Sequence, residues 1–319
     1  MTSIHHIHDT HFRESLSHKD LAQDFLDNYL PPAVRRHVDL STLRLCKDSF
    51  VSADKSTFYS DLLYKVATTA KSEAFIYLLF EHKSSPDRFT ALQMLRYMVE
   101  IWEQYLDQYP NPNSLPCIIP IVVYHGPSSQ QGITMGELVD IPGQDMQTYV
   151  PDFTLDFLDF SPKTDRKIKG QIITQLFVLC LQAKNEPKAV HRLVEIFALI
   201  ARLDDSATSM EWIRSIFIYL NQVMDIDKDV VTKLTRLHLT ANKEDTVMTI
   251  AEQWRKEGRM EGEASGQAKA LSRLLSRKFG EHVFKLSAQD RLVRATPEQL
   301  DIWTDRILDA KTIEDVFSV

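Results

Sequence analysis

The chain has 319 residues, of which 44% are hydrophobic and 25% charged, a composition typical of a globular protein with two or three folded units. Its formal net charge is −7, with −9 in residues 1–160 and a local +5 in residues 254–294. The acidic first half argues against a protein that binds nucleic-acid phosphates strongly through that half alone.

The cysteines and the apolar runs indicate the compartment. Cys46, Cys117 and Cys180 are far apart and form no C-x-x-C pair, which argues against a disulfide framework or a zinc knuckle and fits a reducing compartment. The first residues contain no apolar export signal, and the longest apolar runs are well below the roughly 20 residues of a membrane span. We therefore expect a cytoplasmic protein with no membrane partner.

The first half mixes helix and strand patterns. Apolar spacing and chain breaks predict a helix, three strands, a second helix and a buried strand, at residues 10–28, 42–46, 58–68, 73–83, 89–108 and 117–124. This order predicts an α/β core of the type α-β-β-β-α-β, layered by helices, within a domain of residues 1–160.

The second half is predicted to be all helical. Apolar residues recur at three- and four-residue spacing over residues 168–183, 189–203, 210–224 and 229–239, which we assign to a helical region of residues 161–250. A long polar helix over 246–279, with a glycine at every fourth position from Gly258 to Gly266, indicates close helix packing or a hinge. With a last helix that begins near Thr296 and Pro297, it makes up residues 251–319.

The segment FIYLLFEHKS, residues 75–84, carries the strongest chemical signal. An apolar strand ends in Glu81, His82 and Lys83, and strand alternation predicts that Glu81 and Lys83 project from the same face. An acid and a base at the end of a buried strand are costly unless they pair or bind a metal ion.

A second carboxylate is predicted beside the first. If the strands form a hairpin whose turn is centred on Lys71, Asp61 lies directly opposite Glu81, with Cβ atoms about 5 Å apart. Two carboxylates at that distance repel each other unless a cation lies between them. A divalent metal ion held by Asp61 and Glu81, with Lys83 beside it, would provide hydrolytic chemistry.

The alternative to such a site is a surface hairpin with a cross-strand Lys–Glu pair. The motif E-x-K alone does not exclude this alternative, because it is very common. The long apolar strand before Glu81 and the matching position of Asp61 favour the metal site.

Several stretches in one order resemble a known family. HDTHFRESLSHKDLAQDFLDNYLP, SDLLYKV, YLLFEHKSSPD, RYMVEIWEQY and PCIIPIVVYHG, within residues 8–127, are similar to the recombination-promoting nucleases, also catalogued as a transposase family, of the PD-(D/E)xK superfamily. The resemblance implies a restriction-endonuclease-like core followed by an all-helical half. It also implies Asp61 and Glu81 as metal ligands and Lys83 as the catalytic lysine.

The resemblance implies an activity as well. The expected function is a Mg²⁺-dependent DNA endonuclease, with Mn²⁺ as a substitute, that acts on phosphodiester bonds in DNA recombination or in defence against mobile elements and phages. Many relatives have glutamine where this chain has Lys83, and the lysine favours activity. The residues from Ala270 onward also resemble a small helical domain of unassigned function found at the ends of such proteins.

Two other functions stay open. The chain can be an inactive DNA-binding or regulatory relative that keeps the nuclease fold, which the acidic first half allows. A purely structural helical oligomer would account for residues 165–319 but not for the carboxylate hairpin. We expect DNA as a partner, and the C-terminal helices are the place where a homo-oligomer would form.

Further residues are weaker candidates. Gln93 lies where related nucleases often have a glutamine that faces the site, and the alternative is an ordinary exposed residue. Lys269, Arg273 and Arg277 form a stripe four residues apart, either a solvated face or a contact to the DNA backbone. Asp9 is expected to cap the first helix, and the alternative is that it contributes to the site.

Histidines are concentrated at the N-terminus. His5, His6, His8, His11 and His18 are five of the eleven histidines of the chain. A metal site among them is not favoured, because no downstream partner with ligand spacing completes it.

Overall fold

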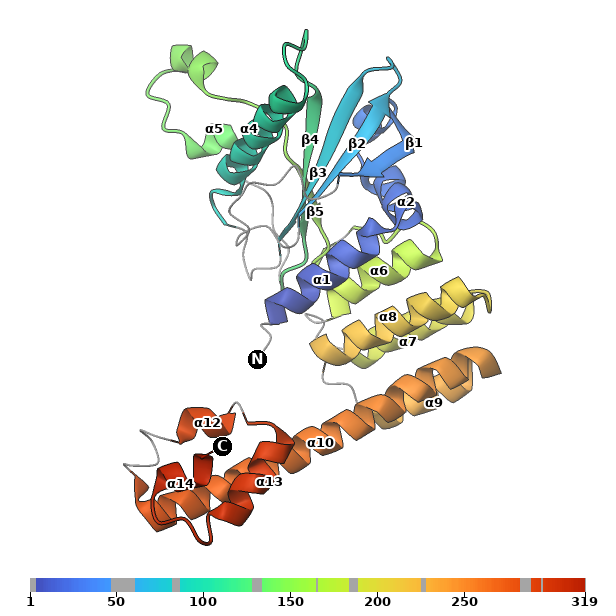
Figure 1. Cartoon of the computed structure of the whole chain (residues 1–319). Coiled ribbons are helices and arrows are strands. Elements are labelled where there is room, and N and C mark those ends of the chain that lie inside the picture. Colours follow the sequence, from blue (N-terminus) through green and yellow to red (C-terminus); the bar gives the residue numbers. More distant parts are fainter. Residues whose placement is uncertain are drawn as a thin grey trace. The chain divides into compact units, whose positions relative to one another are not determined.

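The chain is divided into two compact units, residues 1–247 and 248–319, drawn in Figure 1. The computed structural model describes residues 4–46, 61–81, 87–127, 134–164, 166–183, 189–224, 228–281, 288–293 and 295–318. The boundary expected at residue 160 lies inside the first unit, and the one expected at residue 250 lies close to the observed division.

The first unit is built on a five-stranded sheet with the strand order β1-β2-β3-β4-β5. Strands β1 to β3 are antiparallel neighbours, and β4 and β5 continue the sheet in parallel. The bounds are β1 (Val38–Leu45), β2 (Leu62–Thr68), β3 (Glu73–Glu81), β4 (Cys117–Tyr124) and β5 (Asp156–Asp159). Helix α4 (Thr90–Gln108) makes the crossover from β3 to β4. The predicted β-β-β-α-β order is confirmed, whereas β5 was not predicted.

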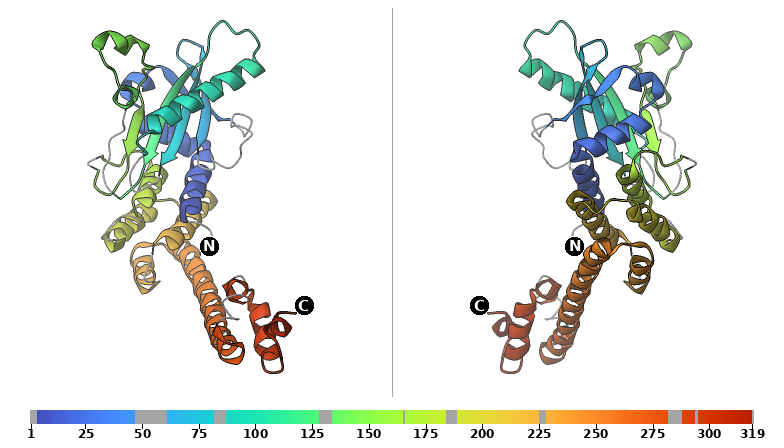
Figure 2. Two further views of the ribbon diagram at one scale, coloured as in Figure 1. Left: turned by 90° about the vertical axis from the view of Figure 1, so that its left-hand side faces the viewer. Right: turned by 90° about the vertical axis from the view of Figure 1, so that its right-hand side faces the viewer.

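Both faces of the sheet are covered (Figures 1 and 2). Helices α1 (Ile4–Ser17), α2 (Lys19–Tyr29) and α6 (Ile172–Ala183) share one apolar core with alternate residues of the strands, including Ile76 and Leu78 of β3. Helix α4 shares a second core with the intervening residues, including Tyr77 and Leu79. Strand β3 is therefore buried on both sides, which explains its nearly continuous apolar sequence.

The first predicted helix is in fact two helices. His18 has extended backbone angles (φ −75°, ψ 116°) between α1 and α2, and the Tyr64 hydroxyl donates a 2.5 Å hydrogen bond to the Leu16 carbonyl in the last turn of α1. Because α1 begins at Ile4, Asp9 lies inside it. The expected N-cap role of Asp9 is therefore wrong.

The helices after the sheet belong to the same unit as the sheet. Asp24 of α2 accepts hydrogen bonds from the Gln171 amide (2.7 Å) and the Thr174 hydroxyl (2.5 Å) at the start of α6. It thereby provides the acceptor that the first turn of a helix needs. Helices α7 and α8 pack against α6, and α9 packs against α7. This continuous packing explains why no division falls at residue 160.

Among the other described helices, α10 is the longest, with 39 residues. Their bounds are α3 (Pro32–Arg35), α5 (Met135–Leu138), the 3₁₀ helix η1 (Gln144–Tyr149), α7 (Ala189–Ala201), α8 (Ala207–Val223), α9 (Lys228–His238), α10 (Ala241–Phe279), α12 (Gln289–Val293), α13 (Pro297–Arg306) and α14 (Ile313–Phe317). A Cβ atom at Gly262 or Gly266 would meet nothing within 4 Å. These two glycines therefore mediate no close packing among the described residues.

The second unit has a core of its own. Leu271 and Leu275 of α10 pack with residues of α12, α13 and α14, and Trp303 and Phe317 meet edge to face with ring centroids 4.7 Å apart. Thr296 and Gln299 form a reciprocal capping box at the start of α13, as predicted.

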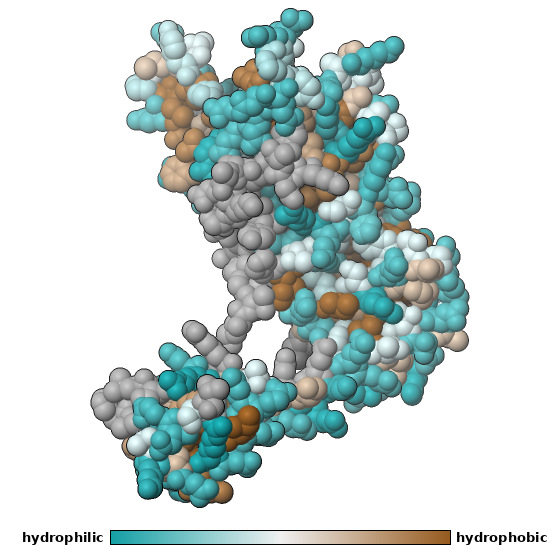
Figure 3. Space-filling view, viewed as in Figure 1, coloured by the Kyte–Doolittle hydropathy of each residue, from teal (hydrophilic) through white to brown (hydrophobic). Residues whose placement is uncertain are grey.

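The described residues contain no helix that is both long and apolar enough to cross a membrane. On the face of the molecule seen in Figure 3, hydrophobic residues of the described chain form separate small patches among hydrophilic ones. No continuous apolar surface is visible on the described residues of that face.

Lys243 holds the end of α7. Its side chain is 2% exposed, and its Nζ atom donates hydrogen bonds to the carbonyls of Leu203 (2.5 Å) and Ala201 (3.4 Å), with Asp205 Oδ1 at 3.4 Å. A buried cation at these carbonyls satisfies acceptors that the helix leaves open and complements the helix dipole.

We therefore expect Lys243→Met to destabilise the first unit by about 2 kcal/mol, because two carbonyls lose a charged donor. For a unit of this size the melting temperature should fall by roughly 4–8 °C. Lys233→Met on the exposed side of α9 is the matched control and should change it little. Equal melting temperatures for both variants would contradict the role of Lys243.

Candidate functional site

The candidate site lies where β2 begins and β3 ends. Leu62 pairs with Leu78, so the register, continued by one residue, sets Asp61 opposite Leu79. The expected direct pairing of Asp61 with Glu81 is therefore wrong by two residues.

The turn between the strands explains the difference. The Thr68 amide donates to the Ser72 carbonyl at 2.8 Å, which closes a turn centred on Ala70 rather than Lys71. Lys71 adopts a left-handed φ of 63°, which residues other than glycine and asparagine seldom do. The sequence therefore carried no clear signal for the centre of this turn.

The face of each residue is unaffected by this shift. A displacement of two residues keeps the alternation of a strand, so positions 61 and 81 fall on the face of Tyr77 and Leu79, which α4 covers. Diagonal neighbours on one face are about 7 Å apart, rather than the roughly 5 Å of opposed residues. The wider spacing gives a cation more room between two carboxylates.

Part of the predicted site lies outside the described residues. Glu81 is the last residue of β3, and its backbone pairs with Tyr124 of β4, but its side chain is not described. Lys83 lies in the segment 82–86, also outside the described residues. Their roles stay predictions.

Asp61 is half-buried and is held by a tyrosine. The Tyr77 hydroxyl donates a 2.5 Å hydrogen bond to Asp61 Oδ2, and the Tyr77 side chain is only 4% exposed. Burial, reinforced by the negative charge of Asp61, raises the pKa of Tyr77 well above its usual value. Tyr77 therefore stays protonated and acts as the donor.

A second tyrosine links this pair to α4. Tyr97 meets Tyr77 edge to face with ring centroids 5.5 Å apart, and Gln93 Nε2 donates a 2.7 Å hydrogen bond to the Tyr97 hydroxyl. Burial raises the pKa of Tyr97, and the charge of Asp61 adds to the effect. The structure thus brings the predicted Gln93 within two side chains of Asp61.

Tyr77 and Tyr97 were missed by the sequence analysis. Tyr77 is four residues before Glu81 on the same face of β3, and Gln93 and Tyr97 are one helical turn apart on α4. Both relations are present in the sequence, but apolar neighbours on the same strand and helix made the two tyrosines look like ordinary core residues.

The donor chemistry of the site fits a hard divalent cation. Carboxylate oxygens are the ligands that Mg²⁺ and Mn²⁺ prefer, and Asp61 supplies a carboxylate that is already oriented. Within the described residues no group of three or more His, Cys, Asp or Glu side chains could hold a metal ion. The side chain of Glu81 is not among those that the structure describes.

The N-terminal histidines that are described lie mostly in a buried cluster. His8 Nδ1 is 2.7 Å from the Tyr219 hydroxyl, and its ring centroid is 5.0 Å from that of His125, the residue after β4. His11 stacks on Tyr219 at 3.9 Å. These contacts hold α1 against α8 and against the sheet edge where β3 and β4 end.

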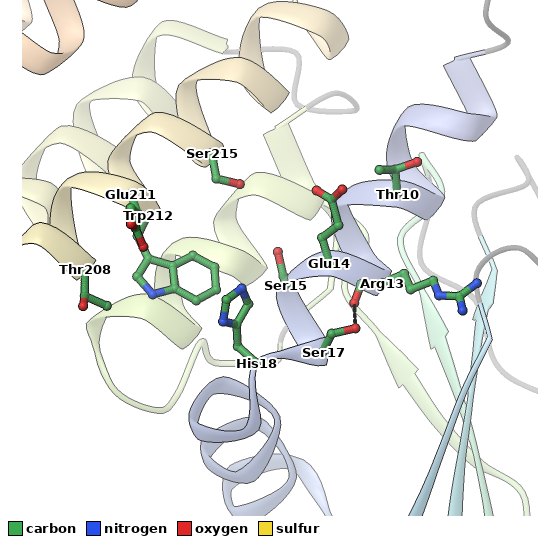
Figure 4. A pocket seen from close by; sticks show the side chains of 10 residues that line it. All are labelled: Thr10, Arg13, Glu14, Ser15, Ser17, His18, Thr208, Glu211, Trp212 and Ser215. Carbon is green, nitrogen blue, oxygen red and sulfur yellow. Dashed lines mark hydrogen bonds between the residues drawn. The ribbon is translucent and has the colours of Figure 1, made fainter. Parts of the chain in front are cut away.

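A groove separates the exposed sides of α1 and α8 (Figure 4). One cavity of about 710 Å³ there is lined by Glu14, His18, Glu211 and Trp212, among other residues, with the rings of His18 and Trp212 4.8 Å apart. In Figure 4, Arg13 points away from Trp212. The lining mixes both signs of charge and offers no converging set of groups for catalysis.

The predicted basic stripe is exposed. Lys269, Arg273 and Arg277 lie on the solvent side of α10, and the first two line a cavity of about 560 Å³ together with residues such as Gln289 and Leu300. Cationic side chains at an open cavity are available for an anionic partner, although a solvated face remains the alternative.

Comparison with known proteins identifies relatives. Residues 6–211 match the profile of the family described as "Putative transposase, YhgA-like". The recombination-promoting nuclease RpnA of Escherichia coli (strain K12) is 30% identical over 258 residues, 79% of this chain and 84% of the relative. The inactive recombination-promoting nuclease-like protein RpnE of the same strain is 27% identical over 253 residues, 79% and 82% of the two chains.

A further relative matches a smaller share of the chain. The recombination-promoting nuclease RpnD of Escherichia coli O157:H7 is 34% identical over 122 residues, 38% of this chain and 46% of the relative. No solved structure matches the chain.

Burial of His11 makes the first unit sensitive to acid. Its pKa is lowered from 6.5 to about 3 by burial, so the fold requires the neutral ring. The stabilising contribution is complete above the unfolded pKa of 6.5 and is lost as pH falls toward 3.

We expect the stability of the wild type to decrease below pH 6.5 by up to about 1.4 kcal/mol per pH unit from this residue. His11→Phe, which keeps an aromatic ring against Tyr219, should flatten this slope in urea unfolding measured from pH 7 to 4. His37→Phe replaces an exposed histidine and should leave the slope unchanged. A slope in His11→Phe as steep as in the wild type would contradict the prediction.

Proposed function

This chain belongs to the YhgA-like transposase family, and we propose that it is a metal-dependent DNA endonuclease with Asp61, Glu81 and Lys83 as its chemical centre. The observation that carries the proposal is the register of the β2–β3 hairpin, which sets positions 61 and 81 on one face where β3, a strand with a largely apolar interior, ends. The names of relatives as recombination-promoting nucleases support the same activity.

The order of elements supports assignment to the PD-(D/E)xK superfamily. A β-β-β-α-β series, in which the acids stand on the second and third strands and a helix follows the third, is the arrangement that the resemblance implied. In this chain those strands are β2, which Asp61 directly precedes, and β3, which ends at Glu81, and the helix is α4.

Asp61 and Glu81 are proposed to bind Mg²⁺, with Mn²⁺ as a substitute. A divalent cation supplies polarisation of a phosphoryl oxygen and a water molecule of lowered pKa. Asp61 is oriented by Tyr77 for this purpose. Lys83 is proposed to orient the nucleophile and to offset the negative charge that develops on the phosphoryl group.

Other residues are proposed to bind DNA. Gln93, on the helix that covers the site face, is proposed to approach the substrate at the site. Lys269, Arg273 and Arg277 are proposed to contact the phosphate backbone, which the acidic first half binds poorly on its own. A homo-oligomer would form through the C-terminal helices.

The biological setting is proposed on the same basis. We propose DNA recombination, or defence against mobile elements and phages, as the process in which the nuclease acts. A cytoplasmic location agrees with the three free cysteines, since disulfides are rare in that compartment.

An inactive relative is the second candidate. Two similar proteins of Escherichia coli (strain K12), RpnE and YjiP, carry names that describe them as inactive. In that case the chain would keep the fold and bind DNA without cleaving it. Lys83 favours the active form, and a cleavage assay separates the two candidates.

We expect purified wild-type protein to cleave plasmid DNA with Mg²⁺ or Mn²⁺ and to lose this activity in excess EDTA. Asp61→Ala, Glu81→Ala and Lys83→Ala should each abolish cleavage, because groups that act together give losses that do not add. Ca²⁺ should support little turnover, because its coordination is larger and less strict.

Glu73→Ala is the matched control. Glu73 is a carboxylate at the other end of β3, paired with Lys65 at 2.6 Å, and an exposed ion pair contributes under about 1 kcal/mol. Its loss should leave cleavage intact. If the wild type binds DNA without cleaving it under any of these conditions, the inactive relative becomes the better description.

The basic stripe has its own test. Replacing Lys269, Arg273 and Arg277 by Gln should weaken DNA binding and reduce the slope of log K against log salt by up to about 3, since each neutralised phosphate contributes about 0.9. The control replaces Arg255, Lys256 and Arg259, on the same helix, by Gln and removes the same charge. If both triple variants lose DNA binding equally, the loss reflects the net charge of the protein and not a contact by the predicted stripe.

A further inference from the structure

We propose that Tyr77 is a positioning residue that fixes the Asp61 carboxylate for the metal ion, with Tyr97 as its support. The inference rests on the proposed function and deepens it, because it adds a layer of residues behind the metal ligands. The feature that carries it is the series of contacts from Asp61 through Tyr77 and Tyr97 to Gln93.

The hydrogen bond constrains the carboxylate itself. Asp61 directly precedes Leu62, the first residue of β2, which pairs with Leu78 of β3. The 2.5 Å bond from Tyr77 to Oδ2 selects one rotation of the carboxylate. Metal-binding carboxylates are themselves hydrogen-bonded in this way, and the outer partner sets the orientation of the ligand.

Tyr77 is held rigidly enough to do this. Its side chain is 4% exposed within the core shared by β3 and α4, and the edge-to-face contact with Tyr97 restrains the ring. Gln93 in turn holds the Tyr97 hydroxyl at 2.7 Å. The position of Asp61 is thus tied to α4, which is separated from it in the chain by the whole of β2 and β3.

A simpler explanation is that a buried tyrosine hydroxyl needs some acceptor. Tyr64 provides the comparison within the same sheet, since this tyrosine is also buried and its hydroxyl donates to a backbone carbonyl, that of Leu16, at 2.5 Å. Tyr77 instead donates to a half-exposed carboxylate at the end of a strand. Because only Tyr77 donates to a carboxylate, a comparison of the two tyrosines can distinguish a role in positioning Asp61 from the simple need of a buried hydroxyl for an acceptor.

The test compares Tyr77→Phe with Tyr64→Phe in the full chain. Each change removes one buried hydroxyl, so both variants should lose thermal stability. Only Tyr77→Phe should weaken Mn²⁺ binding, by about 10–100-fold in Kd as is usual when an outer partner of a metal ligand is lost. Binding is measured by calorimetry without DNA, and the Mg²⁺ concentration for half-maximal cleavage should rise in parallel.

A spectroscopic measurement covers the case in which Tyr77→Phe does not fold. In protein with ¹³C at the tyrosine ζ carbons, the Tyr77 resonance should move on Mg²⁺ addition and in Asp61→Asn, while that of Tyr64 should not. A Tyr77 resonance unmoved by both changes would overturn the inference.

The outcomes separate this inference from the proposed function. If the wild type binds Mn²⁺ and Tyr77→Phe binds it equally well, Tyr77 has only a structural role and the nuclease proposal stands. If Tyr64→Phe weakens binding as much as Tyr77→Phe, the effect is one of general destabilisation and the inference fails. If the wild type neither binds Mn²⁺ nor cleaves DNA, the proposed function fails and the inference fails with it.

Discussion

Strand β3 lies between β2 and β4, and apolar cores cover both of its faces. A polar side chain in the middle of such a strand would be buried without water, at a cost of several kcal/mol unless it found a partner. Tyr77 is the polar side chain that does lie there, and it has one. The charged residues of β3, Glu73 and Glu81, lie at its two ends. Charged side chains on this strand are therefore confined to the strand ends.

The same constraint determines what the surrounding helices do. Helix α4 closes one face and brings Tyr97 and Gln93 to the tyrosine on the strand. Helices α1, α2 and α6 close the other face, and the second of these also supplies Asp24, which caps the third. The helical layers that follow extend this packing, so the sheet and the helices to residue 247 form one unit.

The spacing of apolar residues was sufficient to predict most of the helices and strands. It was not sufficient to predict the turns and breaks between them. Strands β2 to β4 and helix α4 were predicted because their apolar residues are numerous and regular. Strand β5 was missed because it has only four residues, two of them aspartates, and the break at His18 was missed because no glycine or proline marks it. The predicted register of the hairpin was wrong by two residues because Lys71 adopts a left-handed backbone conformation that a lysine rarely adopts.

The two acidic residues of the candidate site could be predicted from the sequence. The tyrosines that lie behind them could not. Asp61 and Glu81 stood out because charge at the end of an apolar strand is unusual, and strand alternation was enough to assign them one face. Tyr77 and Tyr97 could not be recognised, because a tyrosine in an apolar series is equally compatible with simple core packing. Only the contacts that Tyr77 makes with Asp61 and with Tyr97 of α4 distinguish it from an ordinary core tyrosine. These contacts can be seen only in the folded chain.

The register of the β2–β3 hairpin also limits how this part of the chain can diverge. Insertion of one residue between Thr68 and Ser72 would move Asp61 to the face of Leu78, away from Tyr77, unless a longer loop or a bulge absorbed it. Insertion of two residues would restore the face and change only the stagger. Among relatives that keep the carboxylate pair, an odd change in length at this turn should therefore come with a longer loop or a bulge that preserves the register.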